Sequence, residues 1–298
     1  MSRCPTLCLL LMAAFLAHCG RAPDAPTTAA SPEEAVDGLA AQVAANAKGL
    51  RAVATVEHAR LAAKEGVPMP ASVVTIVSDP AVNTALMQAQ PQVGLDLPLK
   101  VLAYADGDDA RVLLPQAAFV AARHGVTDEP ALAAYAKRME DVVADIDESV
   151  VTSLGDTGVE RDFGIVRLTS THDFEETKRR LRATITAQGD TVWFGEVDFQ
   201  ADASAEGASI APATLFLFGG PKPGGVAMAQ FPKLGLDAFC QKLLVLQVGD
   251  TVELLFNSIV AFADFHYGRH AKPHELLDKR LRATFEKALQ SDEDEGGR

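Results

Sequence analysis

The sequence predicts an α+β protein made of two tandem copies of one domain, each an antiparallel sheet with helices packed on one face. The chain has 298 residues, of which 48% are hydrophobic and 22% charged, a composition typical of a globular protein with two cores of ordinary size. The tripeptide Gly-Leu-Asp occurs at Gly94 and again at Gly235. This recurrence after about 141 residues indicates an internal repeat.

Further landmarks recur in the same order, which supports a duplication of the whole unit. They are Pro80 with Pro221, Met87 with Met228, Pro91 with Pro232, Asp96 with Asp237 and, after a one-residue insertion, Lys100 with Lys242 and His124 with His266. Duplicated domains often keep the interface of a homodimer, so we expect the two copies to pack together as a pseudo-dimer.

In the first copy, a helix is predicted to begin after Ser31, which is a suitable N-cap. Pro32 then occupies the first helical position and Glu34 the third. The segments that follow alternate between strand-like and helical patterns. They predict strands near 50–56, 72–78, 99–106 and 110–115, and helices near 117–124 and 129–148.

The second copy shows the same series, preceded by one additional strand at 162–170. A helix follows it, with Asp173 as N-cap and Glu176 three residues later. The remaining pattern predicts strands near 190–199, 213–218, 241–248 and 250–257, a short helix through Met228, and helices near 258–268 and 273–290. No counterpart of 162–170 precedes Ser31, so the first copy is expected to lack that strand.

The N-terminus has the pattern of an export signal. One basic residue, Arg3, precedes an apolar stretch too short to span a bilayer, and Cys19 ends a segment that resembles a bacterial lipobox. His18 departs from that motif, which usually has a small residue there. The hypothesis is lipid attachment at Cys19, with a membrane partner through this anchor and an outer-membrane location facing the periplasm. Secretion as a soluble periplasmic protein is the alternative.

These patterns divide the chain into six predicted segments. They are a signal peptide (1–19), a flexible linker (20–30), the first repeat (31–148), a linker (149–161), the second repeat (162–290) and an acidic, disordered tail (291–298). Cys240 would be the remaining thiol of the mature chain, so no internal disulfide is expected, and its apolar surroundings indicate a buried side chain.

The segment SDPAVNTALMQAQPQVGLDLPLKVLAY (78–104), followed by AAFVAARHGV (117–126), resembles the bacterial domain of unknown function 302 family. VEHARLAAKEG (56–66) is similar to a further segment of that family. The second copy departs more, because AFCQK replaces LPLK and Phe199 stands where His58 is. The resemblance implies an α+β domain of about 100 residues and no assigned reaction.

The net charge of −13 argues against a nucleic-acid partner, because an acidic protein repels phosphate backbones. The sequence contains no phosphate-binding loop, dinucleotide fingerprint, nucleophile elbow, C-x-x-C or H-E-x-x-H motif. No cofactor is therefore predicted.

Four residues are weak candidates for acid–base chemistry: Asp96, His124, Asp237 and His266. The alternative for each aspartate is a turn residue that accepts backbone N–H bonds, and for each histidine a helix-ending residue favoured by the helix dipole. His266, His270 and His274 have i, i+4, i+8 spacing, which could hold a metal only on a continuous helix, and Gly268 and Pro273 argue against one.

Aromatic residues concentrate in the second copy and suggest either an apolar ligand pocket or a change in core composition. The residues expected around such a pocket are Trp193, Phe216, Phe218 and Phe231. The leading functional hypothesis is therefore binding of a small apolar or amphipathic ligand, or of a partner protein, at the cell envelope. An enzyme that uses an Asp/His pair and a purely structural envelope component are the alternatives.

Overall fold

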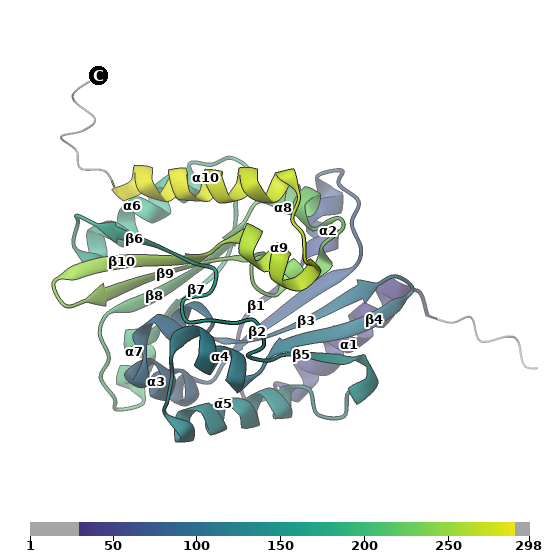
Figure 1. Ribbon diagram of the computed structural model, residues 1–298, viewed down its shortest axis with the longest axis horizontal. Helices are drawn as coiled ribbons and strands as arrows, with labels where there is room; N and C mark the ends of the chain where they lie inside the picture. The colour runs from purple at the N-terminus through teal and green to yellow at the C-terminus, as the bar shows by residue number, and fades with distance from the viewer. Residues whose placement is uncertain (1–29, 290–298) are drawn as a thin grey trace, which may run out of the picture.

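A computed structural model describes residues 30–289 of the chain, and it contains two five-stranded sheets, one in each copy (Figure 1). The strand order is β1-β2-β3-β4-β5 in the first sheet and β6-β10-β9-β8-β7 in the second. The two sheets and their helices give the α+β pseudo-dimer that the repeat predicts.

The first copy follows the predicted pattern closely. Its helices are α1 (Pro32–Asn46), α2 (His58–Lys64), α3 (Pro80–Ala89), α4 (Ala117–His124) and α5 (Glu129–Val142), with the 3-10 turns η1 (Pro91–Leu95) and η2 (Glu148–Val150). Its strands are β1 (Arg51–Glu57), β2 (Ser72–Ser78), β3 (Leu99–Asp106), β4 (Asp109–Pro115) and β5 (Val151–Leu154). Ser31 caps α1 in a reciprocal box with Glu34, as its sequence predicts.

The second copy repeats this series. Its strands are β6 (Ile165–Ser170), β7 (Val192–Asp198), β8 (Ala213–Gly219), β9 (Gln241–Val248) and β10 (Thr251–Asn257). Its helices are α6 (Phe174–Thr186), α7 (Phe199–Ala205), α8 (Pro221–Met228), α9 (Ile259–Tyr267) and α10 (Lys272–Leu289), with the 3-10 turn η3 (Pro232–Gly235). Asp173 caps α6 by accepting from the Glu176 N–H.

The two sheets differ at one edge. In the second sheet β6 precedes its copy and pairs antiparallel with β10. Within residues 30–289 the first copy has no counterpart of β6, and β5 takes the corresponding position beside β4, in parallel orientation. The segment 149–161, expected as a linker, therefore contains an edge strand, because an uncovered β4 would leave a row of backbone groups without partners.

Each Gly-Leu-Asp segment packs against the sheet of the other copy. A Cβ on Gly94 of the first copy would lie 3.1 Å from Leu244 Cδ1 on β9, and one on Gly235 of the second copy would lie 2.9 Å from Leu102 Cδ1 on β3. Each glycine thus allows its backbone to approach the other copy's central strand. The repeated tripeptide marks the junction between the copies.

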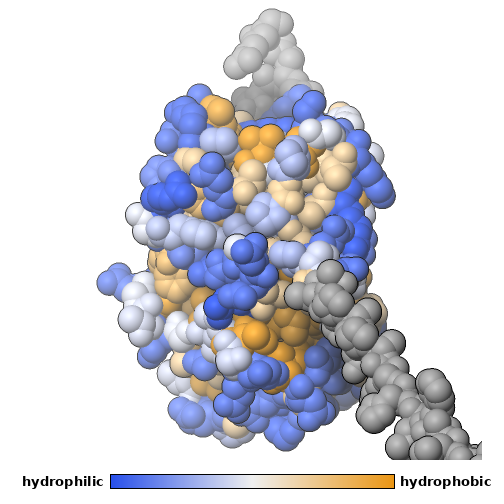
Figure 2. Space-filling model, turned by 90° about the vertical axis from the view of Figure 1, so that its right-hand side faces the viewer, coloured by the Kyte–Doolittle hydropathy of each residue, from blue (hydrophilic) through white to orange (hydrophobic). Residues whose placement is uncertain are grey.

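The surface on the face seen in Figure 2 is mostly polar, with apolar residues in separate patches. The exposed large hydrophobic side chains of the described residues are Val192, Val226, Val248 and Leu276. Between residues 30 and 289, no helix is both long enough and apolar enough to cross a membrane.

Candidate functional site

Asp96 and Asp237, the aspartates of the two Gly-Leu-Asp segments, meet in one buried cluster at the junction of the copies. The Lys100 ammonium bridges them, with its Nζ 2.7 Å from Asp96 Oδ1 and 2.9 Å from Asp237 Oδ1. All three side chains are at most 1% exposed. Both aspartates lie in turns, but their carboxylates are buried away from a pocket mouth and bind side chains instead of backbone N–H groups.

The second oxygen of each carboxylate binds the histidine of the same copy. Asp96 Oδ2 accepts from His124 Nε2 at 2.7 Å and from Arg123 at 2.6 Å, while Asp237 Oδ2 lies 3.2 Å from His266 Nε2. Both histidines occupy the last turn of their helices, α4 and α9, which orients them toward the junction. The four acid–base candidates are thus brought together in pairs.

Arg123 and Asn257 connect the two halves of the cluster. The Arg123 guanidinium donates to Asn257 Oδ1 at 2.6 Å, and Asn257 Nδ2 donates to the Asp237 backbone carbonyl at 2.7 Å. Arg123 also lies over the Phe262 ring of the second copy, 4.9 Å from its centroid. Phe265 stands at the position of Arg123 in the second copy, so this connection exists once rather than twice.

Charge pairing decides the ionisation of the cluster. Burial alone would raise the pKa of Asp96, but the charges of Arg123 and Lys100 outweigh it and hold that pKa well below its usual range. The pKa of Asp237 is lowered in the same way by Lys100. Burial would lower the pKa of Lys100, but Asp237 and Asp96 raise it. Two carboxylates therefore face the ammonium and the guanidinium as a balanced set.

Lys242, the counterpart of Lys100, has no such partner. Its side chain is buried, and its Nζ has no hydrogen-bond acceptor among the described residues. Burial and the adjacent Lys100 charge lower the pKa of Lys242 to about 7. The two equivalent lysines therefore differ in proton affinity, because a second ammonium beside the first would lack a carboxylate.

The Asp/His pairs have the geometry of acid–base groups but no access to solvent. Asp96, His124 and Asp237 are 0% exposed as side chains, and His266 is 2% exposed. A substrate cannot reach them in this conformation. In this state the cluster acts as an ion-pair network that joins the two copies.

The three histidines considered for a metal have separate partners. His270 pairs with Asp264, and His274 Nε2 lies 2.9 Å from the Ala227 carbonyl, whereas His266 binds Asp237. Helix α9 ends before Gly268, which adopts a left-handed conformation, and α10 begins afresh. No group of three or more His, Cys, Asp or Glu side chains within residues 30–289 is arranged to hold a metal.

The four aromatic pocket candidates fall into two places. Trp193 contacts Phe216 and Phe218, each at 5.7 Å between ring centroids, in the core beneath α6 and α10. Phe231 instead packs against Tyr267, with the ring centroids 5.0 Å apart. They do not converge on one cavity. Cys19, the lipidation candidate, lies outside the described residues, and Cys240 is a buried free thiol.

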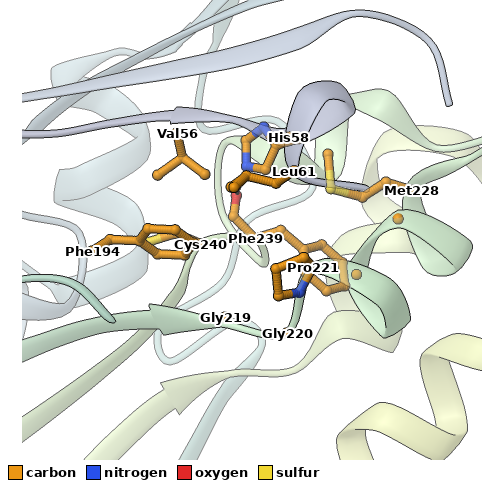
Figure 3. Close-up of a pocket in the computed structure, with 12 residues that line it drawn as sticks. Val56, His58, Leu61, Phe194, Gly219, Gly220, Pro221, Met228, Phe239 and Cys240 are labelled. Carbon is orange, nitrogen blue, oxygen red and sulfur yellow. Dashed lines mark hydrogen bonds between the residues drawn. The ribbon is translucent and has the colours of Figure 1, made fainter. Parts of the chain in front are cut away.

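A pocket does exist at the junction, lined by both copies (Figure 3). It provides about 30 Å³ for water-sized groups, which is room for roughly two or three of them. Its walls are Val56, His58 and Leu61 from the first copy, and Phe194, Gly219–Pro221, Gly224, Gly225, Met228, Phe239 and Cys240 from the second.

Glycines of the second copy open this pocket. Gly219, Gly220, Gly224 and Gly225 line it, and the equivalent positions of the first copy carry larger side chains, all of them buried: Ser78, Asp79, Asn83 and Thr84. Gly225 also allows α8 to approach α2, because a Cβ there would lie 2.5 Å from Ala62 Cβ. The second copy thus has no side chains at four positions that carry buried side chains in the first copy.

His58 is the polar residue of the pocket wall, and it too joins the copies. Its Nε2 lies 3.1 Å from the Phe239 carbonyl, toward which the ring points in Figure 3, and its Nδ1 lies 3.2 Å from Ser72 Oγ. A neutral ring satisfies both contacts when Nε2–H donates and Nδ1 accepts the hydroxyl proton. Burial lowers the pKa of His58 to about 4, which keeps the ring neutral.

The segment from Asp237 to Lys242 links pocket and cluster. Asp237 and Lys242 belong to the cluster, whereas Phe239 and Cys240 line the pocket. Sequence reasoning missed Lys100, Lys242 and Arg123 as cluster members. The available signal was the pairing of Lys100 with Lys242 in the repeat, each at the start of an otherwise apolar strand.

Comparison with known proteins shows which family the two copies represent. The family described as "Domain of unknown function DUF302" matches residues 25–146 and 166–291. A solved DUF302 protein from Bacillus stearothermophilus, described as an uncharacterized conserved protein, is 14% identical with a TM-score of 0.38, over 43% of this chain and 98% of that one.

Fluoride-specific ion channels from Brucella suis and Brucella abortus are 37% identical over 76 residues, which is 26% of this chain. The match covers 30% and 28% of those channels, so the chain spans less than a third of their length. Because the family match extends over most of the chain in two segments, the chain belongs to the DUF302 family as a tandem pair of its domains.

Proposed function

We propose that this protein binds a small apolar or amphipathic molecule in the pocket between its two copies, at the bacterial cell envelope. The observation that carries the proposal is the loss of side chains at Gly219, Gly220, Gly224 and Gly225, where the first copy is filled. Apolar walls with one polar group are the usual composition of a small-molecule site. The space favours a ligand of a few heavy atoms.

A series of straight-chain alcohols from methanol to butanol tests this proposal by ligand-detected NMR. Affinity should rise about fourfold for each added CH₂ until the space is filled, and then level off. The variant Gly224→Ala should weaken binding, because the new Cβ would lie 3.3 Å from Phe239 Cδ1 and press that ring into the pocket. Gly38→Ala is the matched control, since nothing lies within 4 Å of its new methyl group.

Equal affinity for all the alcohols, or unchanged binding by Gly224→Ala, would contradict a ligand pocket and favour a structural role for the junction. If the alcohols bind as expected, mass spectrometry of the natively purified protein would identify the natural ligand. An enzyme that uses the Asp/His pairs would require a conformation in which the buried cluster opens to solvent.

The envelope location rests on the N-terminal sequence, with its short apolar stretch and Cys19 before a Pro- and Ala-rich tract. Lipid attachment at Cys19 would hold the protein at the outer membrane, facing the periplasm. Cys19→Ala should move the protein from the membrane fraction to the soluble periplasmic fraction. Unchanged distribution would contradict lipid anchoring, and Cys4→Ala is the matched control.

A further inference from the structure

The buried cluster contains one more lysine or arginine side chain than it has carboxylates. Lys100, Arg123 and Lys242 face two carboxylates, Asp96 and Asp237. All four carboxylate oxygens are already engaged: Lys100 takes one oxygen of each, Arg123 and His124 take the second of Asp96, and His266 takes the second of Asp237. The Lys242 Nζ has no hydrogen-bond acceptor among the described residues, so a proton on it adds N–H donors without an acceptor and a charge without a carboxylate of its own.

A buried ammonium without an acceptor is among the costliest arrangements in a protein interior. A water molecule could accept one hydrogen bond but would leave the charge unbalanced. A small monovalent anion would do both, because it accepts from the Lys242 ammonium and balances the charge of that ammonium.

We propose that the cluster binds one small monovalent anion at Lys242, and that the anion enters together with one proton. The charged and titratable groups facing Lys242 from the neighbouring elements set this coupling. They are Lys100 on β3, Asp96 after η1, Asp237 after η3, and Cys240, which directly precedes β9. Lys100 disfavours the second proton, the two aspartates favour it, and the Cys240 thiol stays neutral because burial raises its pKa to about 12.

This anion site is separate from the pocket at the junction of the copies, and the proposal does not depend on a ligand in that pocket. The pocket is lined by the side of the Asp237–Lys242 segment that carries Phe239 and Cys240, whereas the anion would contact the lysine amine. The tests of alcohol binding and of anion binding are therefore independent, and a negative result in one leaves the other proposal unaffected.

Isothermal titration of the full mature chain with sodium fluoride, chloride and nitrate, at constant ionic strength, tests the proposal. Fluoride is the smallest of these acceptors and should bind one per chain at about pH 6, with affinity falling about tenfold per pH unit above about pH 7. Titration in two buffers of different ionisation enthalpy should show uptake of one proton per anion above that pH.

The variant Lys242→Met should lose binding while remaining folded, because it removes the charged group and keeps an unbranched apolar chain. Lys48→Met, at an exposed position, is the matched control and should bind as the wild type does. Binding that persists in Lys242→Met, binding without proton uptake, or no binding of any of the three anions at about pH 6 would each overturn the proposal.

Discussion

Replacing Lys242 by methionine should stabilise the protein near neutral pH and remove one component of its pH dependence. The pKa of Lys242 falls from 10.5 to about 7 on folding. Between those two pH values the unfolded chain therefore binds more protons than the folded one. Stability from this group is complete above the unfolded pKa and is lost as the pH falls toward the folded one. At about pH 7 the accumulated cost is about 4 kcal/mol.

The measurable part of this effect lies between about pH 7 and about pH 8.5, where wild-type stability should rise by about 2 kcal/mol from this group. The carboxylates of the cluster are ionised throughout that range, and Lys100 stays protonated because its pKa is raised. Urea unfolding in a halide-free buffer, followed by Trp193 fluorescence and by circular dichroism, measures the slope. Lys242→Met should remove it.

Lys100→Met is the matched variant at the equivalent position, and it should have the opposite sign. It removes the ammonium that bridges Asp96 and Asp237, and loss of one partner of a buried ion pair costs about 3–5 kcal/mol. The reasoning would be refuted by an unchanged pH slope in Lys242→Met, or by a Lys100→Met protein as stable as the wild type.

Two further predictions concern the junction between the copies. Gly235→Ala should destabilise the protein by about 1–3 kcal/mol, because the new Cβ would lie 2.9 Å from Leu102 Cδ1 and 3.0 Å from His58 Cε1. Gly38→Ala, in an exposed helical position, should instead stabilise the protein by about 0.5–1 kcal/mol. Urea unfolding of the two variants measures both effects. The pKa of His58 is lowered to about 4, so its contribution is present above the unfolded value and is lost as the pH falls from about 6.5 to about 4. His58→Phe, the residue of the second copy, should therefore flatten the acid side of the stability curve, and an unchanged acid slope would contradict this assignment.

Local patterns predicted most of the secondary structure because they depend on neighbouring residues. The capping box at Ser31 and Glu34 satisfies backbone N–H groups within one turn, so these two residues in the sequence are enough to predict where the helix begins. The short helices α2 and α7 were not predicted. Each directly follows a strand and has seven residues, which is too short for a clear helical period.

The edge strand β5 shows why the expected linker was wrong. The segment 151–154 has four residues and no distinctive alternation, so nothing in its own sequence specifies a strand. It becomes one because β4 has an open edge, since no counterpart of β6 pairs with it among residues 30–289. A strand of this kind is decided by its partner.

By itself, the sequence determined that two copies of one DUF302 domain follow one another, and that Asp96, His124, Asp237 and His266 occupy equivalent positions in them. Only the tertiary structure decided that all four meet in one cluster, because each Gly-Leu-Asp segment crosses to the other copy's sheet. It also decided that Lys100 is paired while Lys242 is not. The physical reason is that two buried carboxylates balance the charges of two buried cations and leave a third without a counterion. This imbalance arises because side chains of both copies lie in the same interior.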